Sequence, residues 1–260
     1  MSSSELRDAA TAFRRARETR EPIQAPSETI KDLTLNQAWE IQRLTVEMAT
    51  SSGDRLVGYK LGNIAKVMQA AFGLDHPDYG FLLASSFHHE GQPLSRAQFI
   101  KPYVELEPAF ILRGPLKGPN CTAADVIRAV DYVVPAIEII DSRVRDWTIT
   151  LEDTVADCGS NGAVIIGGSP RKPADLDLGN TKGVLCFNGR DITAGNTRNI
   201  LGNPYAAVAW LVNRLHAWDV GFEAGQIILP GSCLEAMPMT EAGRWSCTFE
   251  GWGTVEFDVE

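Results

Sequence analysis

The sequence lacks the features that mark several common classes of protein. Its five cysteines are odd in number and form no Cys-x-x-Cys pair, so they predict reduced thiols in a cytoplasmic protein, not a disulfide framework or a zinc site. No apolar run is long enough to cross a bilayer, and the first residues hold no apolar signal core. We therefore expect a cytoplasmic protein without a membrane segment.

Positive charge and several catalytic signatures are also scarce or missing. The sequence has 24 Lys and Arg residues and 33 Asp and Glu residues, which gives a net charge of -9. This charge argues against nucleic acid and acidic membranes as partners. A small anionic substrate stays possible, because a metal and local cations can reverse the field inside a pocket. No GxSxG, P-loop or GxGxxG-after-strand pattern supports serine hydrolase, NTPase or dinucleotide chemistry.

The pattern of predicted elements indicates an α+β protein. The length of 260 residues suits one medium domain with a small helical appendage. Amphipathic helices are predicted over 4–18 and 34–51, so we expect an N-terminal helical arm (1–55) followed by a catalytic domain (56–260). After residue 56 strands outnumber helices without regular alternation, which favours a mixed or antiparallel sheet over a Rossmann or TIM arrangement.

Strands are predicted at 56–62, 99–113, 133–140, 163–166, 226–229, 246–249 and 254–259, with a hairpin at 184–192 about Asn188-Gly189. Helices are predicted at 65–72, 122–132, 151–157 and 204–218. Residues 75–80 are predicted as a turn and 88–90 as a solvated loop.

The stretch Lys101–Phe110 holds two acids at strand spacing. Glu105 and Glu107 share one face of a strand, and Val104 and Leu106 share the other. Two adjacent carboxylates are costly to bury unless a cation lies between them, and Mg²⁺ or Mn²⁺ prefers such oxygen ligands. The alternative is a half-exposed strand whose acidic side faces water. The apolar run that follows favours a buried strand.

A third acid, Glu138, lies inside the apolar strand Val133–Ile140. Such a residue is expected to bind metal or to pair with a buried Arg or Lys. Three Glu on two core strands would leave about three positions of an octahedral ion for substrate and water.

Four further residues could each serve an active site or have a purely structural role. Lys60, between Gly58 and Gly62, either serves a pocket or is a surface lysine. Asp78 is either a base or an ordinary turn residue, and Ser160 either offers its hydroxyl to an anion or forms a turn. Arg143 is expected to pair with Asp141 or with other neighbours.

The combination resembles one known family in a single register over residues 34–260. The matching segments are Gly58–Gly62, Lys66–Gln69, Pro77–Gly80, Val104–Glu107, Leu116–Thr122, Asp131–Arg143, Asp153–Asp157, Leu201–Pro204, Val208–Leu211 and Ala224–Leu229. They are similar to the hydratase/decarboxylase family of aromatic meta-cleavage pathways, whose fold is the mixed β-roll of fumarylacetoacetate hydrolase.

The resemblance implies a site and an activity. It places Mg²⁺ or Mn²⁺ on Glu105, Glu107 and Glu138, and catalysis on Lys60 and Asp78. Substrate binding falls on Ser160, Arg143 and Leu61. It implies a hydratase of a 2-hydroxy-dienoate or 2-oxo-enoate, in a cytoplasmic homo-oligomer with a possible pathway partner enzyme. The alternatives are a decarboxylase of a vinylogous 2-oxo diacid and a non-catalytic partner subunit.

Two segments depart from the family pattern. Gly62-Asn63-Ile64-Ala65 replaces Gly-Leu-Thr-Ser, so two hydroxyls are lost and an amide appears. The late loop, Gly231–Pro238, adds Leu234 and the acid Glu235. We expect both changes near the pocket, where they would affect the tail of the substrate.

Overall fold

The protein is seen in a computed structural model that describes residues 3–64 and 76–260. The helix predicted over 65–72 lies outside these residues. Within the described ranges no helix combines the length and apolar character that a membrane crossing needs.

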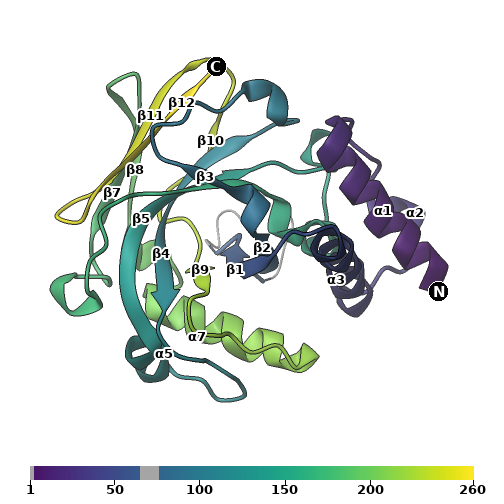
Figure 1. The fold of residues 1–260 in the computed structure, drawn as a ribbon, viewed down its shortest axis with the longest axis horizontal. Helices are drawn as coiled ribbons and strands as arrows, with labels where there is room; N and C mark the ends of the chain where they lie inside the picture. Colours follow the sequence, from purple (N-terminus) through teal and green to yellow (C-terminus); the bar gives the residue numbers. More distant parts are fainter. Residues whose placement is uncertain (1–2, 65–75) are drawn as a thin grey trace.

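Two sheets form the body of the molecule (Figure 1). In the described part of the chain the larger has eight strands, in the order β2-β1-β9-β4-β5-β6-β3 with β10 beside β4. The smaller has four, in the order β12-β11-β7-β8. The β1–β9 and β3–β6 pairs are parallel and the other pairs antiparallel, which confirms the predicted mixed sheet. The strands are β1 (Leu56–Gly62), β2 (Asp78–Leu83), β3 (Phe87–His89), β4 (Tyr103–Leu112), β5 (Val130–Ile140), β6 (Asn161–Ile166), β7 (Lys182–Phe187), β8 (Arg190–Asn196), β9 (Ile227–Leu229), β10 (Met237–Pro238), β11 (Gly243–Phe249) and β12 (Gly253–Val259).

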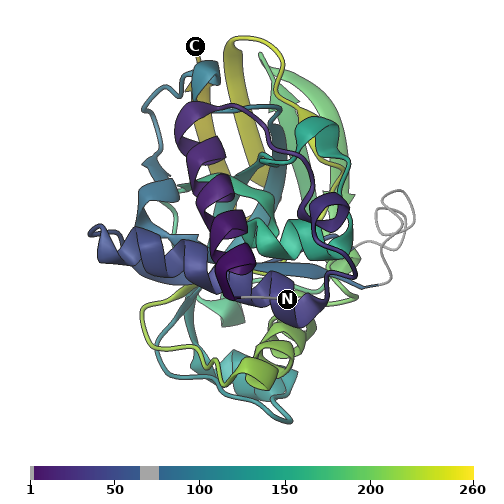
Figure 2. The same cartoon turned by 90° about the vertical axis from the view of Figure 1, so that its right-hand side faces the viewer.

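Helices cover the curved sheet from two sides. The helices are α1 (Ser3–Thr19), α2 (Pro26–Thr29), α3 (Leu35–Ser51), α5 (Ala123–Ala129), α6 (Leu151–Ala156) and α7 (Pro204–Leu215). The N-terminal helices α1 and α3 pack on each other, and α3 also packs on α6 and β2 (Figures 1 and 2). A capping box between Thr34 and Gln37 begins α3, as predicted. The division into an arm and a catalytic domain stays a prediction.

Three local predictions are wrong, and strand pairing explains two of them. His88 and His89 belong to β3, which pairs with β6, so residues 88–90 are not simply a solvated loop. Asp78 begins β2 opposite Gly62 on β1 and is not in a turn. The helix predicted to Tyr132 ends at Ala129, because Val130 is already extended and starts β5.

Candidate metal centre and its cavity

Three carboxylates from two neighbouring strands meet at one point. Glu105 and Glu107 project from the same face of β4, and the antiparallel register sets Glu138 of β5 directly opposite Glu105. One oxygen from each carboxylate lies within 4.8 Å of the others. Glu107 and Glu138 are fully buried and Glu105 is half-buried. The predicted facial set is therefore brought together in space.

The electrostatics of these carboxylates fit a divalent cation. Burial and the neighbouring Glu138 raise the pKa of Glu105 to about 8, and burial with both neighbours raises the pKa of Glu107 well above its ordinary value. Glu107 Oε2 accepts a hydrogen bond from the Gly231 amide at 2.7 Å. Its Oε1 is buried and has no hydrogen-bond partner among the described residues. A hard cation would satisfy this oxygen and cancel the repulsion.

Lys60 supplies a positive charge beside the carboxylates. It is 1% exposed at the centre of β1, so it is not a surface lysine. Its Nζ lies 3.0 Å from Glu138 Oε2, as an ion pair without aligned hydrogen-bond geometry, and donates to the Gly159 carbonyl at 2.8 Å. Burial lowers the pKa of Lys60, but the nearby carboxylates, Glu138 first, raise it by more, so the pKa lies above its ordinary value.

Asp78 faces Lys60 from the adjacent strand, and only one of its two carboxylate oxygens is hydrogen-bonded to described residues. Oδ2 accepts hydrogen bonds from Asn63 Nδ2 at 2.5 Å and from Thr154 Oγ1 at 3.2 Å. Oδ1 is buried and has no hydrogen-bond partner within the described ranges. Burial raises the pKa of Asp78, and Lys60 opposes that rise. This carboxyl is suited to exchanging a proton with a ligand.

Two glycines make the approach of Lys60 and Asp78 possible. A Cβ on Gly62 would lie 2.4 Å from Asp78 Oδ1. A Cβ on Gly159 would lie 3.1 Å from Lys60 Cδ, and Gly159 also has a left-handed φ of 62°. Side chains at these two positions would push the ionisable groups apart.

Ser160 is presented by a strained turn. Cys158, Gly159 and Ser160 are three consecutive residues with positive φ, near 54°, 62° and 54°. Such conformations cost energy in non-glycine residues and are held here by surrounding contacts. The Ser160 hydroxyl lies 3.3 Å from Thr154 Oγ1 and 3.4 Å from Asp157 Oδ2.

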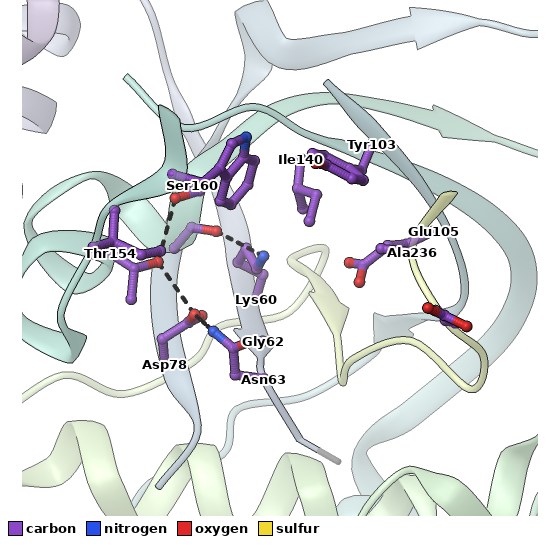
Figure 3. Close-up of a pocket in the computed structure, with 14 residues that line it drawn as sticks. Lys60, Gly62, Asn63, Asp78, Tyr103, Glu105, Ile140, Thr154, Ser160 and Ala236 are labelled. Atoms are coloured by element: carbon purple, nitrogen blue, oxygen red, sulfur yellow. Dashed lines mark hydrogen bonds between the residues drawn. The ribbon is translucent and has the colours of Figure 1, made fainter. Parts of the chain in front are cut away.

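Lys60, Asp78, Glu105 and Ser160 share one cavity of about 200 Å³ (Figure 3). Lys60 and Asp78 face it from β1 and β2, Glu105 from β4, and the apolar side chains of Tyr103 and Ile140 lie along another wall. The lining residues are Lys60, Gly62, Asn63, Asp78, Tyr103, Glu105, Ile140, Trp147, Ile149, Thr154, Gly159, Ser160, Glu235 and Ala236. The cavity thus has an acidic corner at Glu105, the buried ionisable groups Lys60 and Asp78, and an apolar wall.

Two residues predicted to bind substrate do not line this cavity. Arg143 is buried and ion-paired with Asp157, with Nε 2.6 Å from Oδ1. Leu61 follows Lys60 on β1 and is fully buried in the apolar core. Neither residue lines the cavity, and we give neither a direct role in substrate binding.

The structure also places residues that the sequence did not single out. Asn161 Nδ2 donates to Glu138 Oε1 at 2.9 Å, and Trp147 contributes to the apolar wall. No local pattern marks either residue, because both reach the site through pairing and loop geometry. Asn63 and Glu235, from the two departing segments, line the cavity as expected.

Comparisons with known proteins agree with this geometry. No protein-family model matches the sequence. A 2-oxo-hept-4-ene-1,7-dioate hydratase of Escherichia coli is 38% identical over 246 residues, covering 92% of each chain. A 2-hydroxyhexa-2,4-dienoate hydratase of Comamonas testosteroni is 37% identical over 225 residues, covering 86% of this chain and 85% of the relative.

Solved structures show the same architecture. A 4-oxalocrotonate decarboxylase from Pseudomonas putida G7, complexed with magnesium and adipate, has a TM-score of 0.97 and 27% identity, and covers 100% of this chain and 99% of its own. A fumarylpyruvate hydrolase from Pseudomonas aeruginosa, in complex with Mn²⁺ and pyruvate, has a TM-score of 0.62 at 15% identity. It covers 78% of this chain and 88% of its own, and at this identity shares the fold alone. The predicted β-roll is thereby confirmed.

Proposed function

The chain belongs to the 2-keto-4-pentenoate and 2-oxo-hept-4-ene-1,7-dioate hydratase family, and from this premise we propose how its site adds water to a 2-hydroxy-dienoate or 2-oxo-enoate. The observation that carries the proposal is the set of Glu105, Glu107 and Glu138 carboxylates beside Lys60, at a cavity that Lys60, Asp78 and Glu105 line. Glu105, Glu107 and Glu138 would hold Mg²⁺ or Mn²⁺, which supplies Lewis-acid polarisation of the 2-oxo group when bound.

Lys60 would hold negative charge on the substrate. Its ammonium group is fixed by Glu138 and by the Gly159 carbonyl, so little reorganisation is needed when charge develops nearby. We assign Lys60 to binding the carboxylate or the enolate-like oxygen of the 2-oxo acid. The Ser160 hydroxyl, which shares the cavity, is assigned to binding the same end of the substrate.

Asp78 would transfer protons. Its open Oδ1 and raised pKa allow it to accept a proton and return it within one turnover. The 2-hydroxyl of the dienol loses a proton while the far carbon gains one, which gives a conjugated enone. Water then gives its hydroxyl to the remote alkene carbon and a proton to the neighbouring carbon. The net change is the gain of one water.

A decarboxylase is the second candidate because the decarboxylase structure matches nearly the whole chain. The same polarised ketone would accept the electron pair released when a remote carboxylate leaves as CO₂. A cation for that second carboxylate would favour this reaction. Lys60, paired with Glu138, is the one cation among the described cavity residues, and Glu235 adds negative charge. We therefore rank hydration first.

The experiment offers the Mg²⁺-loaded protein 2-hydroxypenta-2,4-dienoate and, separately, 2-oxohex-3-enedioate. Ultraviolet absorbance follows loss of conjugation, and mass spectrometry identifies the products. A product heavier by one water supports hydration. Loss of CO₂ from the diacid assigns the decarboxylase, and silence on both substrates with metal bound contradicts these two substrate choices. A chelator-treated sample is the control for metal dependence.

A further inference from the structure

The two oxygens of Glu138 are held by different parts of the chain. Oε2 lies 3.0 Å from Lys60 Nζ, and Oε1 accepts a hydrogen bond from Asn161 Nδ2 at 2.9 Å. Both Glu138 and Asn161 are almost completely buried. A partner that donates to a ligating carboxylate fixes its rotamer, and the loss of such a partner typically weakens metal binding.

A bulge between β5 and β6 aims Asn161 at Glu138. The register pairs Ile139 with Ala163 and then Ile140 with Asn161, so Gly162 is the extra residue. A Cβ at Gly162 would lie 2.8 Å from the Ile139 carbonyl oxygen, which only glycine avoids here. Bulges commonly re-aim a neighbouring side chain in this way.

Two arginines hold the backbone of Asn161 from behind. Its carbonyl oxygen accepts hydrogen bonds from Arg143 Nη1 at 2.8 Å and from Arg17 Nη2 at 2.5 Å. Arg143 is neutralised by Asp157 and belongs to the same end of the sheet. Arg17 comes instead from α1, so this contact links the N-terminal helix to the candidate metal centre.

We propose that Arg17 is a positioning residue of the metal site, which acts through the Asn161 carbonyl to hold the amide that orients Glu138. The N-terminal helix α1 then contributes to metal binding through Arg17, in addition to packing on α3. This inference rests on the proposed function, because it takes the three carboxylates as metal ligands. Arg17 is neither one of the three carboxylates nor one of the residues that line the cavity.

Mn²⁺ affinity tests this role without reference to turnover. The metal-free protein is titrated with Mn²⁺, and free Mn²⁺ is followed by its electron paramagnetic resonance signal. We expect Arg17→Met and Asn161→Leu each to weaken binding by about tenfold. The double variant should be no weaker than Asn161→Leu alone, because both changes break one chain of contacts. Arg15→Met, at an exposed position of the same helix, should leave affinity unchanged.

The outcomes separate this role from general stability and from the proposed function. The inference fails if folded Arg17→Met binds Mn²⁺ as wild type does, or if its effect adds fully to that of Asn161→Leu. If Arg17→Met does not fold, Arg17→Ala, which also removes the donor to the Asn161 carbonyl, takes its place under the same criteria. Glu107→Gln is titrated alongside. If Glu107→Gln keeps full affinity for Mn²⁺, the proposed metal site is wrong. If Glu107→Gln loses affinity while Arg17→Met binds Mn²⁺ as wild type does, only the positioning role is refuted.

Discussion

Glu105 and Glu138 face each other directly across the β4–β5 strand pair, one half-buried and the other fully buried. Directly opposed like charges destabilise a strand pair. With Glu107 two residues along β4, the pair becomes a set of three carboxylates served by one buried lysine. Such a site stores unfavourable electrostatic energy that a divalent cation would relieve.

Glu107→Gln should therefore stabilise the metal-free protein. The raised pKa of Glu107 means that the folded protein must either keep this side chain protonated or bury it ionised, and both cost free energy relative to the unfolded chain at neutral pH. Glutamine avoids this cost and keeps the shape of the side chain. An increase in melting temperature of about 2–4 °C corresponds to about 1 kcal/mol in a protein of this size. Calorimetry with a chelator present measures it. A lower melting temperature than that of the metal-free wild type would contradict the account.

Stability of the metal-free protein should fall as pH rises from about 5 to 8. The pKa of Glu105 is raised to about 8 in the folded state and that of Glu107 is raised as well, so the folded protein keeps protons that the unfolded chain has released. Stability falls with pH wherever the folded state binds more protons. Because metal replaces these protons, the rise in melting temperature on adding Mn²⁺ should be larger at the alkaline end. Calorimetry across this range tests both statements, and a metal effect that shrinks with pH would refute them.

The arrangement of these acids was only partly predictable. Strand alternation set Glu105 and Glu107 on one face, and the apolar surroundings of Glu138 required a partner for it. The register that sets Glu138 opposite Glu105 could not be predicted from the sequence, because it depends on pairing between two strands that α5 separates along the chain. Asn161 was overlooked for the same reason, since a bulge sets its direction.

Other differences also arise from long-range contacts. Arg143 was expected to pair with Asp141 or other neighbours and, from the resemblance, to bind substrate; its ion-pair partner is Asp157, from the turn after α6. His88 and His89 looked like loop residues, but parallel pairing with β6 makes them an edge strand. The helices were easier to predict, because capping boxes at Thr34 and Thr122 are local signals.

Asp78→Asn should lower kcat by about 10²–10³ and leave KM little changed, as expected when a proton-transfer group is lost without loss of binding contacts. The amide keeps the shape of the carboxyl, so folding should be preserved. Steady-state kinetics on the accepted substrate measure both constants. An unchanged kcat would remove Asp78 from the mechanism.

Gly159→Ala should reduce activity beyond its effect on stability. The new Cβ meets Lys60 Cδ at 3.1 Å, and φ is left-handed. Gly202→Ala is the matched control, because Gly202 also has positive φ but no atom of the described residues lies within 4 Å of the position that its Cβ would take. Both variants should lose about 1 kcal/mol of stability. Only Gly159→Ala should lose turnover. Equal turnover in the two variants would show that the position of Lys60 does not depend on a glycine at residue 159.

Glu235→Arg should shift preference toward substrates with a second carboxylate. Glu235 is exposed at the cavity beside an apolar wall, where it disfavours a negatively charged tail. Reversing its charge should raise the ratio of kcat/KM for diacid over monoacid by about three- to tenfold at low salt, and less at high salt. The exposed Glu241→Arg, outside the cavity lining, is the control. An equal change of this ratio in both variants would show that the overall surface charge, and not the position of Glu235 at the cavity, sets the preference.

The most direct test of the central claim measures bound metal and hydration rate in the same preparations of wild type and Glu105→Gln during a Mg²⁺ titration. The account predicts that hydration by the wild type follows occupancy of one ion per chain. It also predicts that Glu105→Gln loses affinity and at least about a hundredfold in rate, since a Lewis-acid ion contributes several kcal/mol. Unchanged metal binding and turnover in Glu105→Gln, or full turnover by metal-free wild type, would contradict it.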